Sequence, residues 1–177
     1  LYLFSLYKVY GPHQGMLYLR RSVGDSLPAQ SHHFLAKSPT KRFNPAGPQH
    51  AEVAACAGVI DYFTNLMAHH GLRYDGSPVS LPAALQQLHP LIAEYETRLA
   101  APVIQFLVES NAAQLLGKPH CNDGDRAPTI AFRPTNLSPG EVSAQMQALG
   151  VGAEHGDFYA GRVLDGMGVD RREGVVR

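Results

Sequence analysis

Lys8 is the residue near the amino-terminal end whose surroundings could support covalent chemistry. It lies in the segment 5–15 (SLYKVYGPHQG), after a short apolar run, between Tyr7 and Tyr10, and just before a Gly-Pro turn. We expect these tyrosines to exclude part of the water around the amine, and a partly desolvated lysine is more nucleophilic. The pattern favours Schiff-base chemistry. On the residues alone, a solvated surface lysine is the competing interpretation, because most lysines are of that kind.

Metal binding is a second chemistry that the nine histidines suggest. Two adjacent pairs, at 32–33 and 69–70, would point about 100° apart on a helix and would not converge on one ion. His120, Cys121 and Asp123 are ligand-type residues close together in one turn, but a solvated loop explains them as well. We predict no metal site, and a metal-dependent enzyme built on these three residues stays open as an alternative.

The bulk composition argues against several classes of protein. Fifteen basic residues balance fifteen acidic ones, so no basic surface for nucleic acid is expected. There is no run of about 18 apolar residues that could span a bilayer, and neither Cys56 nor Cys121 belongs to a disulfide or zinc pattern. Phosphate-loop, nucleophile-elbow and dinucleotide motifs are also missing. We expect a cytoplasmic globular protein without nucleic-acid or membrane partners.

The elements that would position Lys8 are a strand on each side of it. Residues 1–4 and 15–20 are apolar runs with aromatic residues, separated by the Gly-Pro turn. Residues 29–48, punctuated by prolines, predict a long irregular excursion. Residues 49–70 predict a helix with a mostly covered apolar face. That face consists of Val53, Cys56, Ala57, Ile60, Phe63 and Met67.

A second long helix and a second group of strands follow. An apolar stripe predicts a connecting helix that Pro90 bends or divides. The stripe consists of Leu81, Leu85, Leu88, Ile92, Tyr95 and Leu99. Ser138 with Glu141 three residues later predicts a capped helix. The other expected elements are a strand over 128–133, a strand near Val151, a helix over 159–167 and a terminal strand over 174–177.

The segment around Lys8 resembles the pyridoxal-phosphate (PLP) lysine motif of class V aminotransferases. In that motif, Ser-x-His-Lys follows a strand, and a Gly-Pro-x-x-Gly turn leads into the next strand. The matching residues are Ser5, Lys8, Gly11, Pro12 and Gly15. Tyr7 replaces the usual histidine. The resemblance implies that Lys8 forms the internal aldimine with PLP and moves the substrate's α-proton, and that Ser5 and Tyr7 hydrogen-bond the cofactor phosphate.

Two further segments resemble parts of the same family. The segment 42–48 (RFNPAGP) resembles the Gly-Thr-Pro loop, which reaches the cofactor phosphate of the other subunit in a dimer. Ala46 and Gly47 stand at the Gly-Thr positions, so only backbone amides such as that of Gly47 could serve there. The segment 174–177 resembles the strand whose arginine holds the substrate's α-carboxylate, a role that implies bidentate binding by Arg177.

The segment 154–160 (EHGDFYA) narrows the resemblance within the family. It is similar to the segment in which cysteine desulfurases carry Arg-x-Gly-x-x-Cys-Ala. Tyr159 occupies the cysteine position and Glu154 the arginine position. Transfer of sulfur through a persulfide is therefore not expected, because the thiolate is missing. A cysteine desulfurase-like subgroup with other chemistry fits better.

The resemblance implies an α/β fold: the C-terminal part of a PLP fold type I large domain over 1–80 and most of a small α+β domain over 81–177. It further implies a transferase or lyase that acts on an amino acid and forms a homodimer when complete. The chain lacks an initial Met and ends in a strand-like run, so we expect an incomplete piece without activity alone. The alternative from another class is a non-catalytic α/β interaction domain.

Overall fold

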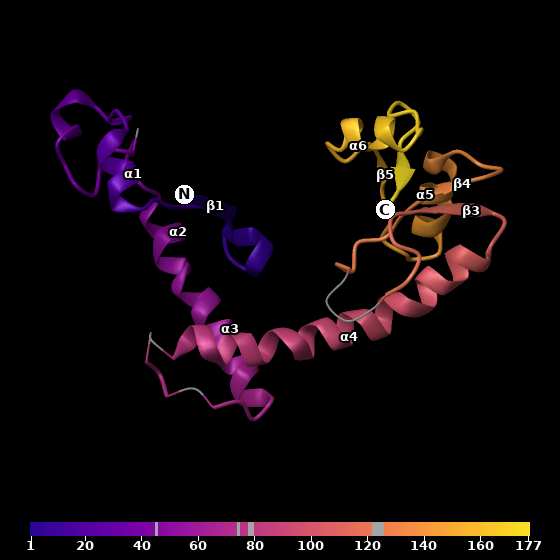
Figure 1. The fold of residues 1–177 in the computed structure, drawn as a ribbon, viewed down its shortest axis with the longest axis horizontal. Coiled ribbons are helices and arrows are strands. Elements are labelled where there is room, and N and C mark those ends of the chain that lie inside the picture. The colour runs from indigo at the N-terminus through magenta and orange to yellow at the C-terminus, as the bar shows by residue number, and fades with distance from the viewer. Residues whose placement is uncertain (45, 74, 78–79, 122–125) are drawn as a thin grey trace. The chain divides into compact units, whose positions relative to one another are not determined.

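The computed structural model describes residues 1–44, 46–73, 75–77, 80–121 and 126–177 (Figure 1). It divides the chain into two compact units, Leu1–Leu85 and Gln86–Arg177, which we call the amino-terminal and the carboxy-terminal unit. The sequence placed a boundary slightly earlier, between residues 80 and 81. Identification of these units with parts of a large and a small PLP-enzyme domain stays a prediction.

The amino-terminal unit begins with a hairpin-like pair of strands. Strand β1 (Tyr2–Ser5) pairs antiparallel with β2 (Gly15–Tyr18), with Ser5 opposite Gly15. A single 3-10 turn, η1 (Leu6–Val9), follows β1 directly and carries Lys8. The predicted order of strand, loop and strand is therefore confirmed.

A short helix follows the hairpin and was not predicted. Helix α1 (Arg21–Ser26) has the sequence RSVGDS, and its glycine and serines are weak helix formers with no apolar period. Tertiary packing accounts for it, since Gly24 is buried beside Leu19 and Phe43. Beyond it, the excursion over 29–48 contains only a short 3-10 turn, η2 (His33–Leu35), among its described residues.

The predicted helix over 49–70 forms as two consecutive helices. Helix α2 (His50–Ala55) and helix α3 (Ala57–His69) meet at Cys56. Val59 and Met67 of α3 are buried. The expected apolar face is only partly covered, because Val53 and Ile60 remain 49% and 45% exposed. The core of this chain therefore covers the face only in part, and coverage of the rest by a dimer partner stays a prediction.

Helix α4 (Leu81–Glu109) is one continuous helix that contains both Pro90 and Pro102, so Pro90 does not divide it. The predicted stripe was also wrong toward the middle, where Tyr95 and Leu99 are 55% and 56% exposed. The buried positions form two groups, one toward each end of the helix, with a spacing of three to four residues inside each group and an alanine in each. They are Ala84, Leu88, Ala100, Ile104 and Leu107. Because alanine is only weakly apolar, the sequence pattern predicted burial of larger neighbouring residues instead.

The carboxy-terminal unit contains a four-stranded sheet in the order β3-β4-β6-β5, with every pairing antiparallel. Its strands are β3 (Ala113–Leu116), β4 (Ala131–Pro134), β5 (His155–Gly156) and β6 (Val175–Val176). Strand β3 was not predicted, and the strand expected near Val151 lies at β5. A small core forms where the sheet meets α6 (Gly161–Gly166). Its buried residues are Leu116, Leu164, Val169 and Val175.

Helix α5 (Pro139–Ala148) begins with the capping box that the sequence predicted. The Ser138 hydroxyl accepts from the Glu141 amide at 3.2 Å, and the Glu141 carboxylate accepts from the Ser138 amide at 2.8 Å. Hydrogen bonds from the Ser138 backbone and hydroxyl hold the pKa of Glu141 below its usual value. The buried Ser143 hydroxyl donates to the Ala153 carbonyl at 2.9 Å, which attaches the segment before β5 to this helix.

The mixture of helices and sheets confirms the predicted fold class at that level. Among the described residues, no helix combines the length and apolar character that crossing a bilayer requires.

Glu141 should make stability depend on pH. Its folded-state pKa lies below the unfolded value, so its contribution is complete above about pH 4.3 and is lost as the pH falls through the folded pKa. Glu141→Gln cannot titrate, and we expect it to be less stable than the parent chain at neutral pH but not under strongly acidic conditions. Urea unfolding followed by circular dichroism measures this difference. The exposed Glu94→Gln serves as the control, and a difference for Glu141→Gln that stays constant with pH would contradict the assignment.

Candidate active site

The turn that carries Lys8 is fixed by its own backbone. The Leu6 amide donates to the Gln14 carbonyl at 2.9 Å, and the Gly11 amide donates back to the Leu6 carbonyl at 2.8 Å. Tyr10 closes the turn in the left-handed region, with φ of 65°. Leu6 is buried beneath the turn. The position of Lys8 therefore follows from hydrogen bonds and packing in residues that flank it.

Gly11 brings this turn into contact with α3. A Cβ atom at Gly11 would lie 2.9 Å from a Val59 methyl carbon and equally near the Leu6 carbonyl oxygen. Tyr10 adds a ring contact, with its centroid 4.6 Å from that of Tyr62. Only glycine allows the backbone to approach this closely. The glycine of the Gly-Pro turn thus has a physical role, because it lets the Lys8 turn pack directly against α3.

The structure does not place Lys8 in an apolar environment. Its side chain is exposed, and Nζ lies 5.9 Å from the centroid of the Tyr7 ring. Tyr7 is itself 47% exposed and stacks on His13 with ring centroids 4.6 Å apart. Tyr10 turns toward α3 instead of the amine. The expected desolvation of Lys8 by its two tyrosines was therefore wrong within this chain.

Ser5 ends β1 in extended backbone, and Lys8 lies in the 3-10 turn that follows directly. The Ser5 side chain makes no capping bond to η1, which leaves its hydroxyl available. Opposite it, Gly15 has no atom within 4 Å of the position where a Cβ would lie. A lysine amine and a hydroxyl in neighbouring positions of the chain are groups of the types that hold a phosphorylated carbonyl compound such as PLP.

Gly47 lies apart from this turn in the chain, in the exposed stretch 46–49 that leads into α2. No atom comes within 4 Å of the place where its Cβ would be. Pro45, in the same predicted interface loop, lies outside the described residues. Ser5 ends β1, and Tyr7 and Lys8 lie in the 3-10 turn that follows it. The roles of these residues, and that of Gly47 across a dimer, stay predictions.

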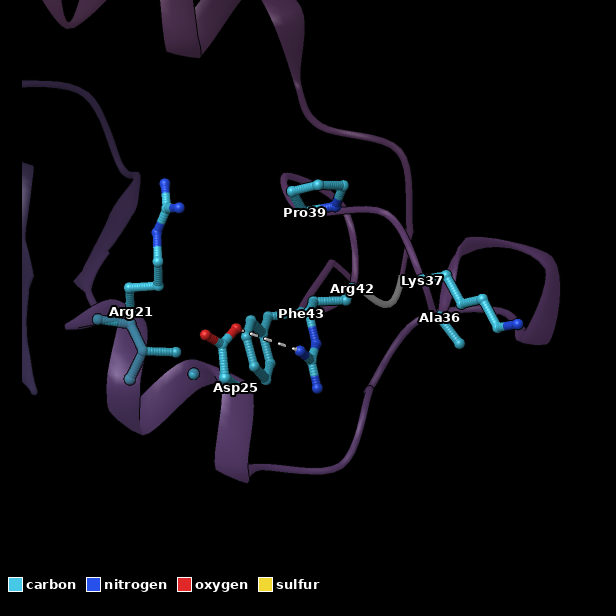
Figure 2. A pocket seen from close by; sticks show the side chains of 9 residues that line it. Arg21, Asp25, Ala36, Lys37, Pro39, Arg42 and Phe43 are labelled. Carbon is cyan, nitrogen blue, oxygen red and sulfur yellow. Dashed lines mark ion pairs between the residues drawn. The ribbon is translucent and has the colours of Figure 1, made fainter.

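The residues before Gly47 line an open pocket of about 590 Å³ (Figure 2). In it, Asp25 and Arg42 face one another with 3.8 Å between their charged atoms, whereas the Lys37 amine points away. Arg42 also donates to the Leu27 carbonyl at 2.6 Å and lies against the Phe43 ring, 5.1 Å from its centroid. Its guanidinium therefore holds the excursion together, which is a structural role.

Arg177 directly follows β6, an inner strand of the four-stranded sheet. Its amide donates to the Glu154 carbonyl at 2.9 Å, and the Glu154 amide donates to the Arg177 carbonyl at 3.1 Å. The guanidinium stacks on Phe158, with Cζ 3.9 Å from the ring centroid. No sequence pattern predicts this contact, because Phe158 and Arg177 are far apart in the chain and meet only through the fold. Arg177 is exposed, and its guanidinium could donate hydrogen bonds to a carboxylate.

The segment that carries Glu154 and Tyr159 is a tight loop beside Arg177. Phe158 and Tyr159 both have left-handed backbone, with φ of 50° and 60°. The Tyr159 amide donates to the Asp157 carboxylate at 3.1 Å, and the Tyr159 side chain is fully exposed. The position that carries cysteine in desulfurases thus projects an aromatic ring away from the loop.

Among the described residues, no three His, Cys, Asp or Glu side chains gather as a metal site would require. His120 and Cys121 belong to the described chain, but Asp123 lies outside it. The alternative of a metal-dependent enzyme on these three residues is therefore not tested.

Comparisons with known proteins bear on the family. No protein-family model matches the chain. The chain is similar to the aminotransferase-like protein FGM3 of Gibberella zeae, with 26% identity over 177 residues. This alignment covers 99% of the chain and 40% of the relative's length. The similarity supports a relation to aminotransferase-like proteins, and it does not distinguish class V from other classes.

Replacing Gly11 by alanine should destabilise the chain by about 1–3 kcal/mol, because the new methyl group would overlap Leu6 and Val59. Gly15→Ala is the matched control. Open space surrounds that position, so alanine there should leave stability unchanged or raise it slightly. Urea unfolding followed by tyrosine fluorescence suits a chain without tryptophan. Equal midpoints for the two variants would show that Gly11 does not need this close approach.

Proposed function

We propose that this chain is part of a PLP-dependent enzyme that acts on an amino acid, with Lys8 as the residue that attaches the cofactor. The supporting observation is the Lys8 turn, a 3-10 turn that follows directly on Ser5, which itself pairs with Gly15, where the backbone has open space around it. Similarity to an aminotransferase-like protein along nearly the whole chain supports the same class. We further assign the enzyme to the class V aminotransferases and their cysteine desulfurase-like subgroup.

Each residue of the proposed site has a separate task. When bound, PLP supplies an electron sink for the α-carbon of an amino acid. The Lys8 amine would hold the cofactor and would accept or donate the proton at the substrate's α-carbon. The hydroxyls of Ser5 and Tyr7 donate to the phosphate, and the backbone at Gly47 does so from a second subunit. Arg177 binds the α-carboxylate through two parallel N–H donors and orients the substrate.

The exposure of Lys8 in this chain constrains the proposal. Efficient proton transfer needs an amine that is free of its proton near neutral pH, and burial is the usual means. Residues that cover Lys8 in the active enzyme must then come from outside this turn, either from another part of the protein or from a second subunit. The relative contains other segments that could supply such residues, because the alignment covers 40% of its length.

Tyr159 sets a limit on the chemistry that we propose. Persulfide formation requires a thiolate at the reacting position, and a phenol cannot replace it. Transamination, a transferase reaction, and elimination of a β-substituent, a lyase reaction, need no thiolate at this position. We therefore propose a transferase or lyase without a desulfurase step.

Reduction by borohydride tests the attachment site. The purified protein is incubated with PLP, reduced, digested and mapped by mass spectrometry. We expect the phosphopyridoxyl group on Lys8, because the adjacent Ser5 hydroxyl retains the phosphate there. Lys8→Ala should remove the label, and Lys37→Ala, which changes another exposed lysine of the same unit, should retain it. Label distributed evenly over the exposed lysines, or unchanged in Lys8→Ala, would overturn the proposal.

A further inference from the structure

The contact between Arg177 and Phe158 leaves the arginine's hydrogen-bonding edge free. The guanidinium lies over the ring, with Cζ 3.9 Å from the centroid, well inside the ~6 Å reach of a cation–π interaction. A guanidinium that stacks by its face keeps its N–H donors in its own plane, where they can hold both oxygens of a carboxylate. Among the residues that the structure describes, no acidic side chain pairs with Arg177.

The Phe158 ring is itself held in place. It packs against the core cluster of the carboxy-terminal unit, next to residues such as Leu164 and Val175. Its backbone has φ of 50°, a conformation uncommon for a residue with a side chain. The Asp157 carboxylate accepts a hydrogen bond from the Tyr159 amide and stabilises this loop. The ring is therefore a rigid surface for the flexible arginine side chain.

A close backbone contact fixes the strand of Arg177 against the same loop. Gly174 is buried with φ of 70°, and a Cβ there would lie within 2.7 Å of the backbone of Gly156. This approach joins β5 to β6, where Gly156 pairs with Val175. The strand that carries Arg177 and the loop that carries Phe158 are thus fixed relative to one another.

Arg171, and not Arg177, interacts with the acidic side chains near this loop. Arg171 binds Asp165 through its side chain, and that hydrogen bond, with the charges of Asp165 and Asp157, raises the pKa of Arg171. Asp157 also accepts from the Tyr159 amide. The carboxylate nearest in sequence to Phe158 is therefore already engaged, and Arg177 stays available for an anion from outside.

We propose that Phe158 is a positioning residue that orients the Arg177 guanidinium to bind the carboxylate of an amino acid. The inference rests on the proposed function, since it concerns the same carboxylate. Phe158 touches the arginine and not the reacting atoms. Its contribution is to reduce the number of side-chain conformations that Arg177 must lose when the carboxylate binds.

Nuclear magnetic resonance of the arginine side chains tests the proposal in the chain itself. The Arg177 resonances should show a ring-current shift in the parent chain that Phe158→Leu removes and Phe158→Tyr retains. Titration with L-alanine should move the Arg177 Nε–Hε signal, whereas L-alaninamide, which lacks the carboxylate, should not. Phe158→Leu should raise the half-saturation concentration about two- to fivefold, as expected for loss of an exposed cation–π contact.

The controls separate positioning from folding and from the proposed function. Phe158→Tyr should bind L-alanine as the parent chain does, and Phe106→Leu, at an exposed phenylalanine of α4, should have no effect. Equal half-saturation in the parent and Phe158→Leu would overturn the inference and leave the proposed function standing. An equal rise in Phe106→Leu would also overturn it. No response to L-alanine in the parent would overturn the proposed role of Arg177 and this inference with it.

Discussion

The close packing of Gly11 between Leu6 and Val59 determines where Lys8 lies. Because no side chain fits at Gly11, the backbone reaches α3, and the turn that begins at Leu6 is pressed onto the helix. The β1 and β2 strands pair on either side of the same turn, so the hairpin and the helix are linked through one small contact. The backbone of the turn fixes the position of Lys8 without any contact from the lysine side chain.

A second close backbone contact has the corresponding role in the carboxy-terminal unit. Gly174 and Gly156 bring β6 against β5, and this places Arg177 beside the loop of Phe158. In both units, a glycine that permits a close approach determines the position of a cationic side chain a few residues away. The cations stay exposed, which is the condition for binding an external anion or carbonyl compound.

Local signals in the sequence predicted the local features of the structure. The strands beside Lys8 and the Ser138–Glu141 capping box depend on neighbouring residues, and they form as expected. Helix α1 and strand β3 carry no such pattern and form through tertiary packing. The buried stripe of α4 was misassigned because its alanines are weakly apolar. Lys8 and Arg177 are predicted as site residues by resemblance. The sequence could not reveal the exposure of Lys8 or the Phe158 contact, since both depend on backbone geometry around left-handed residues.

The proposed function depends on the Lys8 amine as the attachment point for PLP. A crystal structure of the protein grown with PLP tests this most directly. We predict continuous electron density between Lys8 Nζ and the aldehyde carbon of the cofactor, with the phosphate beside the Ser5 hydroxyl. Density that joins the cofactor to another lysine, or a Lys8 side chain in solvent while PLP is bound elsewhere, would contradict the account.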